Sequence, residues 1–177
     1  MLINLGAKAA GEDLVSLLLE CHHRIRGFSA LGVELGTRSD LAAADIAQGC
    51  ERVERYFGEA LPLHVADEEE SLLPRLRGVS PEVDAALAAM HAQHADHKPH
   101  LVALLAALRA LRGAPTNASL RAALLAIIAP LKSDFEAHLV AEEQILFPAI
   151  TASLPADVQA QAVGELRARR KGGPAAR

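Results

Sequence analysis

Apolar residues recur along most of the chain at intervals of three and four positions, the spacing that places them on one face of a helix. Such stretches cover residues 12–36, 39–73, 80–112 and 116–148, and a shorter one covers 155–170. The connections between them are short, so consecutive helices are expected to lie antiparallel. The pattern therefore predicts an all-α protein, an antiparallel up-down-up-down four-helix bundle with a short additional C-terminal helix.

Capping residues support these helix boundaries. Ser39-Asp40 can cap the second helix, Ser80 can cap the third with Pro81 at its first position, and Thr116 or Asn117 can cap the fourth. Three prolines fall inside the predicted helices, where each should kink the helix or leave a carbonyl without its hydrogen bond: Pro62, Pro99 and Pro130.

Composition agrees with a helical core. Of the 177 residues 51% are hydrophobic, but only 3% are aromatic, and this favours helices over sheets. We expect one bundle domain over 12–150, followed at 151–177 by a short C-terminal helix and a basic tail. That tail, from Arg167 to Arg177, is expected to be a frayed end.

Several classes of partner are disfavoured by charge and hydropathy. A net charge of −4 gives no general basic field for nucleic acid. No apolar run reaches membrane-spanning length, so no membrane partner is expected. The two cysteines, Cys21 and Cys50, fit neither a disulfide framework nor a zinc motif. The first residues lack a charged region followed by an apolar one, and we therefore expect a cytoplasmic protein.

One motif occurs twice, with the two copies 74 residues apart. His64 and Glu68 are four positions apart and Pro74 follows; His138 and Glu142 have the same spacing, and Pro148 follows. Residues four apart lie on one face of a helix, so each copy points an imidazole and a carboxylate in the same direction. A single copy would usually be an exposed ion pair, but two copies with matched surroundings indicate a shared site.

The flanking residues place both copies in apolar stripes that should face the core. A buried carboxylate or imidazole without a partner is costly, so these groups require a compensating cation such as iron, manganese or zinc. The stripe of the second helix is Phe57, Ala60, Leu61, His64, Glu68 and Leu72, and that of the fourth is Leu131, Phe135, His138, Glu142, Ile145 and Leu146.

Two further histidines precede the copies at similar distances. His22 lies 42 residues before His64, and His94 lies 44 before His138. Four imidazoles, with two glutamates that each bridge, would give each of two metal ions two nitrogens and two oxygens. An oxo or hydroxo bridge would leave one position open at each ion. The predicted metal ligands are His22, His64, Glu68, His94, His138 and Glu142.

The neighbouring polar residues are expected to lie outside this set. Glu69 and Glu143 fall about 100° further round the helix than the predicted ligands, so they should point to the bundle edge and pair with Lys or Arg or meet solvent. The other histidines are expected at the surface or beside the ligands: His23, His91, His97 and His100.

These motifs resemble the hemerythrin-like proteins of the HHE cation-binding family. The resemblance rests on Cys21-His22-His23, on the two His-x-x-x-Glu-Glu copies with their prolines, and on His94 with Pro99. It spans about 12–150 and implies a four-helix bundle that holds a non-haem di-iron centre. Oxygen-carrying members have five histidine ligands and an aspartate five residues after the last one. The four-His, two-Glu set here is instead similar to that of di-iron proteins of iron–sulfur cluster repair and nitric oxide response.

The resemblance implies a protein that engages dioxygen, nitric oxide or a peroxide for sensing, scavenging or iron donation, with two oxo- or hydroxo-bridged iron ions as its cofactor. An oxidoreductase with peroxidase-like or nitric-oxide-reductase-like turnover is an alternative, so the sequence leaves open whether the protein is an enzyme. A mononuclear zinc or manganese protein is a third reading.

Overall fold

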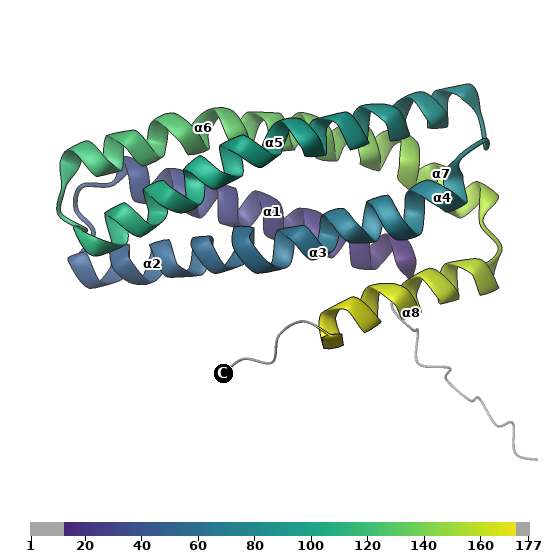
Figure 1. Cartoon of the computed structure of the whole chain (residues 1–177), viewed down its shortest axis with the longest axis horizontal. Helices are drawn as coiled ribbons and strands as arrows, with labels where there is room; N and C mark the ends of the chain where they lie inside the picture. The colour runs from purple at the N-terminus through teal and green to yellow at the C-terminus, as the bar shows by residue number, and fades with distance from the viewer. Residues whose placement is uncertain (1–12, 173–177) are drawn as a thin grey trace, which may run out of the picture.

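The computed structural model describes residues 13–172, and all of its regular structure is helical, which confirms the predicted all-α bundle (Figure 1). Its first and third bundle helices are α1 (Leu14–Thr37) and α5 (Pro81–Gly113). The second bundle helix consists of α2 (Ala43–Arg55), the π-helical segment η1 (Tyr56–Ala60), α3 (Leu61–Ala66), the π-helical segment η2 (Asp67–Leu72) and α4 (Leu73–Leu76). The fourth consists of α6 (Ala118–Ala141), η3 (Glu142–Leu146), again π-helical, and α7 (Phe147–Ser153), and α8 (Ala156–Gly172) follows.

The caps follow the sequence prediction at two of three helices. Ser80 accepts a hydrogen bond from the Val83 N–H, and Asn117 caps α6. The predicted cap at Ser39-Asp40 is wrong, because α2 begins at Ala43 with no side-chain cap. Asp40 instead binds Arg38, with 2.6 Å between its Oδ2 and the Arg38 Nη2. The guanidinium thus occupies the carboxylate that would have capped the helix.

Prolines occupy two kinds of position in the helices. Pro99 and Pro130 lie inside α5 and α6, which continue through them. Pro62, Pro74 and Pro148 each lie at the start of the α-segment that follows a π-helical segment. Because proline lacks an N–H and clashes with the preceding turn, the wider π-turn accommodates it. The expected end of the fourth helix near Pro148 is therefore wrong, since the helix continues to Ser153.

The apolar core has two parts, one on each side of a polar layer. The first includes Ile25, Phe57, Leu104 and Phe135, and the second includes Leu18, Leu72, Met90 and Phe147. Along α1, His22 falls between Leu18 of one cluster and Ile25 of the other. The stripes predicted from the sequence supply these clusters, except that Ala60 is exposed. Helix packing thus surrounds a short polar segment of the bundle with apolar layers.

The helix α8 lies outside the four-helix bundle, beside η2 and α1 (Figure 1). Its Ala162 and Leu166 are buried in the second apolar cluster. Arg169 and Arg170, expected in a frayed end, are helical and both bind the carboxylate of Asp67. The expectation of a frayed basic tail is therefore wrong for these residues, and 173–177 lie outside the described residues. No helix of the described chain is long and apolar enough to cross a membrane.

Candidate metal centre

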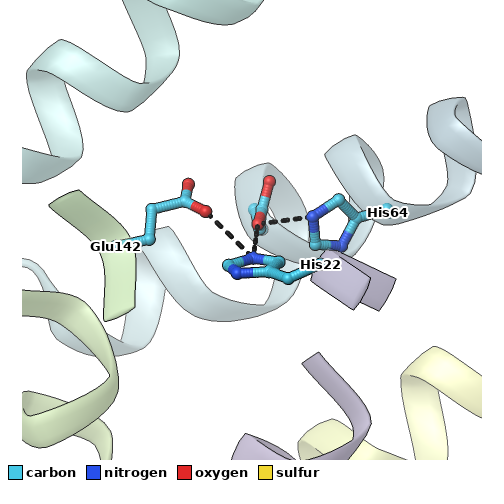
Figure 2. Close-up of side chains that lie close together, drawn as sticks. His22, His64 and Glu142 are labelled. Carbon is cyan, nitrogen blue, oxygen red and sulfur yellow. Dashed lines mark ion pairs between the residues drawn. The ribbon is translucent and has the colours of Figure 1, made fainter. Parts of the chain in front are cut away.

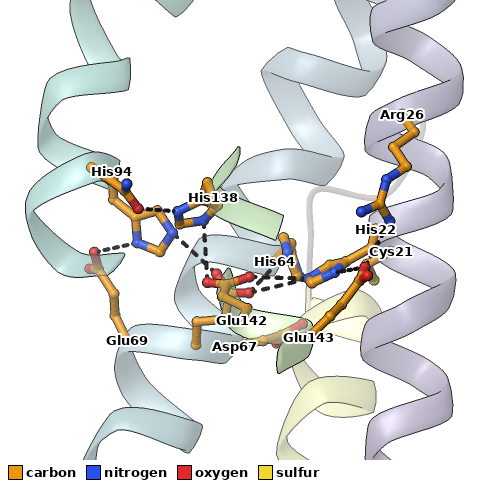
Figure 3. A network of polar contacts seen from close by, with 12 residues as sticks. Cys21, His22, Arg26, His64, Asp67, Glu69, His94, His138, Glu142 and Glu143 are labelled. Carbon is orange, nitrogen blue, oxygen red and sulfur yellow. Dashed lines mark hydrogen bonds and ion pairs between the residues drawn. The ribbon is translucent and has the colours of Figure 1, made fainter. Parts of the chain in front are cut away.

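The six residues predicted as ligands converge in the polar layer between the two apolar clusters. Figure 3 shows His22, His64, His94, His138 and Glu142 together there. They come from α1, the second helix, α5 and the fourth helix, so the site exists only when the bundle has formed. The exposed fraction of each residue is at most 5%: His22, His64, Glu68, His94, His138 and Glu142. Their ligand atoms form two overlapping groups in which all lie within 4.8 Å of one another, and both groups include Glu68 and Glu142.

Glu68 reaches histidines on three helices with its two oxygens. Its Oε1 lies 3.0 Å from Nε2 of His64 and 3.9 Å from Nε2 of His22. Its Oε2 lies 3.2 Å from Nε2 of His94. Figure 2 shows the side chains of His22 and His64 close together, with Glu142 directed toward His22. The Glu68 carboxylate therefore lies between His22 and His64 on one side and His94 on the other.

Glu142 has the corresponding position on the opposite side. Its Oε2 lies 3.2 Å from Nε2 of His22, and its Oε1 lies 3.2 Å from Nε2 of His138. Like Glu68, Glu142 therefore directs its two oxygens toward histidines on different helices, His22 and His138. Both glutamates thus have the arrangement of carboxylates that could bridge two cations.

The outer nitrogens of three histidines are held by side chains outside the cluster. The Nδ1 of His22 lies 2.8 Å from Glu143 Oε1, and that of His94 lies 3.0 Å from Glu69 Oε1. The Nδ1 of His138 lies 2.7 Å from Oε1 of Gln93. Since these oxygens are acceptors, each Nδ1 must carry the proton when the ring is neutral, and each Nε2 then presents its lone pair to the cluster.

The clustered nitrogens and oxygens lack hydrogen-bond partners that a bound cation would replace. All four oxygens of Glu68 and Glu142 are buried without a hydrogen bond, as is Nε2 of both His22 and His64. Lone pairs of neutral imidazoles would face carboxylate lone pairs, which is unfavourable in a buried site. Bound cations would satisfy both sets of atoms. Imidazole nitrogens with carboxylate oxygens suit iron, zinc or manganese rather than calcium.

The electrostatics of the cluster also indicate a shortage of positive charge. Burial and the charge of Glu68 raise the pKa of Glu142, because two carboxylates this close repel each other. Burial disfavours the charged form of His22, but the nearby carboxylates of Glu142 and Glu68 outweigh it and raise the pKa of His22 to about 9. Burial dominates at His138 and lowers its pKa to about 3. Protons would thus partly replace a cation in this cluster.

Glu69 and Glu143 only partly follow the prediction that they point to the bundle edge. Glu143 does bind an arginine there, with 2.7 Å between its Oε1 and Nη1 of Arg26, but the same oxygen also holds His22. Glu69 binds His91 and His94 rather than Lys or Arg. Helical geometry places both residues outside the cluster. Spacing along one helix does not show which histidines of the adjacent helices they meet.

The remaining histidines differ in exposure. His23, His91 and His100 are exposed, as expected for surface residues. His97 is buried, and its ring packs edge-on against Phe135 with 4.9 Å between the ring centroids. The sequence pattern did not single out Gln93, which holds His138. It lies one position before His94 and so on a neighbouring face of the same helix.

One comparison with known proteins finds a match. A family model described as the hemerythrin HHE cation binding domain matches residues 13–150. The matched range contains all six clustered residues and ends before α8 begins. Among curated proteins, no match is found.

Proposed function

The chain belongs to the hemerythrin HHE cation-binding family, and from that premise we propose that it is a non-haem di-iron protein. In this proposal His22, His64, His94 and His138 hold two iron ions, and Glu68 and Glu142 bridge them. The observation that carries the proposal is the pair of overlapping donor groups that share both glutamates. A single ion would need only one of these groups.

When bound, an oxo- or hydroxo-bridged iron pair supplies redox equivalents and open coordination positions for dioxygen, nitric oxide or a peroxide. The protein would use this site to sense or scavenge such a molecule, or to donate iron. Its own residues orient the ligands: Glu143, Glu69 and Gln93 fix the rings of His22, His94 and His138. Apolar clusters lie on both sides of these residues. Free Cys21 and Cys50 support a cytoplasmic location, where thiols stay reduced.

Two other functions make different predictions for the same site. A di-iron oxidoreductase would turn over peroxide or nitric oxide, and the buried donor set is compatible with such chemistry. A mononuclear zinc or manganese protein would hold one ion per chain. The shared glutamates favour two ions over one.

The test is the metal content of the purified protein together with its visible spectrum in air. We expect two irons per chain and absorption in the near ultraviolet and visible, as for an oxo-bridged ferric pair, whereas zinc gives no such absorption. His64→Ala and His138→Ala should each lower bound iron sharply. The matched controls His23→Ala and His100→Ala change exposed histidines and should retain it. One ion per chain, or equal losses in both pairs of variants, would refute the proposal.

A further inference from the structure

A cavity of about 180 Å³ lies against the candidate metal centre. His64, His94 and His138 contribute to its wall, so any molecule inside would lie beside the clustered donors. The rest of the lining is mainly apolar and includes Leu61, Val65, Leu101 and Phe135. The cavity extends from the polar layer into the first apolar cluster, to which Leu61 and Phe135 belong.

The size of this cavity exceeds what a diatomic gas needs. A water molecule has a share of about 30 Å³ in the liquid, and dioxygen and nitric oxide are not much larger. A dry protein cavity of about 150 Å³, lined by Leu, Ile and Phe, binds benzene. The cavity here is slightly larger and has similar apolar walls, so it suits an organic group of about that size.

One polar side chain in the lining has no partner of its own. His97 is only 7% exposed, and its ring contacts Phe135 and His138. Within residues 13–172 no hydrogen bond is made by either of its ring nitrogens. Neither nitrogen is among the fully buried polar atoms of the described residues that lack a partner, so both are accessible to a hydrogen-bonding group, and the ring also borders a polar hollow lined by Asp96 and Asp134. The imidazole can therefore hydrogen-bond a polar group on a ligand that enters the cavity.

The cavity can be reached from the surface. Pro62 of α3 and Lys98 of α5 line it and are both exposed. An apolar ligand could therefore enter between these two helices without unfolding of the bundle. The lining combines an apolar body, one unpartnered imidazole and an exposed rim.

We propose that this cavity binds a small organic hydroperoxide, with an apolar group up to the size of a phenyl ring and an oxygen hydrogen-bonded to His97. The inference rests on the proposed function and selects among its ligands. Dioxygen and nitric oxide carry no substituent, and only a peroxide can carry a group large enough to fill the cavity. The alcohol with the same apolar group is one oxygen atom smaller but presents the same apolar group and a hydrogen-bonding hydroxyl.

Benzyl alcohol is the redox-inert probe for this proposal, titrated calorimetrically into the protein as purified. We expect saturable one-to-one binding with Kd at or below about 1 mM, reasonable for eight heavy atoms in a preformed cavity. Leu101→Phe, which fills the cavity, should weaken binding at least about tenfold. Leu105→Phe is the matched control, because Leu105 lies one turn further along α5, is also partly buried and does not line the cavity. No saturable binding, or equal affinity in both variants, would overturn the proposal.

The role of His97 needs a second probe that lacks the hydroxyl. His97→Leu should weaken benzyl alcohol about fivefold to tenfold, the usual effect of one hydrogen bond, and leave toluene binding unchanged. His100→Leu, an exposed histidine on the same helix, should change neither. Equal losses for the alcohol and toluene would show that His97 only shapes the wall, and would overturn its assignment as the anchor.

Metal content and the visible spectrum are recorded on the same samples, so the two proposals fail separately. Absence of iron in a protein that still binds benzyl alcohol would refute the di-iron function and retain the cavity. Iron in a protein that does not bind benzyl alcohol would retain the di-iron function and refute the proposal for the cavity. Leu101→Phe should keep its iron, because Leu101 contributes no donor atom to the cluster.

Discussion

The two copies of the His-x-x-x-Glu-Glu motif hold equivalent positions in the bundle, but their outer surroundings differ. In the copy on the second helix, the polar residues Asp67, Ser71 and Arg75 lie four positions apart. The equivalent residues of the copy on the fourth helix, 74 positions later, are Ala141, Ile145 and Ala149. The faces that carry the clustered His and Glu residues are thus repeated, whereas the outward faces have different chemistry.

The polar face of the first copy is covered by α8. Asp67 is fully buried one residue before Glu68. Its Oδ1 accepts a hydrogen bond from Nη1 of Arg169 at 2.8 Å, and its Oδ2 accepts one from Nη2 of Arg170 at 2.7 Å. Ser71 donates to Glu165 at 2.6 Å, and Arg75 binds the same carboxylate. An ion-pair network therefore fixes η2, the segment that carries Glu68 and Glu69.

The second copy is supported by packing and by a surface network. Ala149 is buried in the second apolar cluster, and Ile145 packs against it. Glu143 is linked through Arg26 to Glu136, and the exposed fraction of the Glu136 side chain is 53%. The same His-x-x-x-Glu-Glu motif is therefore positioned by buried charges in one copy and by apolar contacts in the other, according to what covers its outer face.

The largest effect is expected from Asp67→Asn. The change removes a buried charge that two arginines hold, and it should lower the free energy of unfolding by about 2–3 kcal/mol, measured by urea denaturation. The matched control is Ala141→Ser, at the exposed equivalent position of the second copy, which should change stability by less than about 0.5 kcal/mol. Similar losses in the two variants would mean that α8 does not distinguish the copies.

The second-largest effect is expected at the glutamates that contact Nδ1 of the clustered histidines His22 and His94. Glu143→Gln and Glu69→Gln should each weaken iron binding about tenfold, because a neutral amide makes its histidine a poorer ligand. The affinity is measured by competition with a chelator. Glu136→Gln is the control for the first variant, because Glu136 binds the same Arg26 but not His22. Unchanged affinity in Glu143→Gln would show that orientation of His22 does not depend on this carboxylate.

The smallest effect is a difference in pH dependence between the two copies. Hydrogen bonds from Arg75 and Ser71 lower the pKa of Glu165 from its ordinary value of 4.5. This carboxylate therefore stabilises the fold above pH 4.5, and its contribution is lost as the pH falls through the lowered pKa. Because Glu165 is partly exposed, the contribution should be less than about 1 kcal/mol. Glu165→Gln should be less stable than the unmodified chain at neutral pH and equal to it in acid; a constant difference would contradict this assignment.

The fold and the clustering of six residues could be predicted because they depend on local periodicity. Repetition of His and Glu at four-residue spacing places both on one helical face, and short connections make neighbouring helices antiparallel. The periodicity of apolar residues does not predict the π-helical segments, although Pro74 and Pro148 follow both of those that contain the glutamates of a motif. The proline ten positions after each motif histidine repeats with the motif, and in the structure it lies just after the wider turn that accommodates it.

The sequence by itself determined which residues share a helical face, because that depends only on helical geometry. The tertiary structure decided what meets each face from outside. Glu143 holds His22 across more than a hundred residues of sequence, and Arg169 and Arg170 reach Asp67 from the last helix. The same holds for the cavity beside His97, whose walls come from four helices. Such contacts depend on how helices pack in space, and no spacing along one helix can specify them.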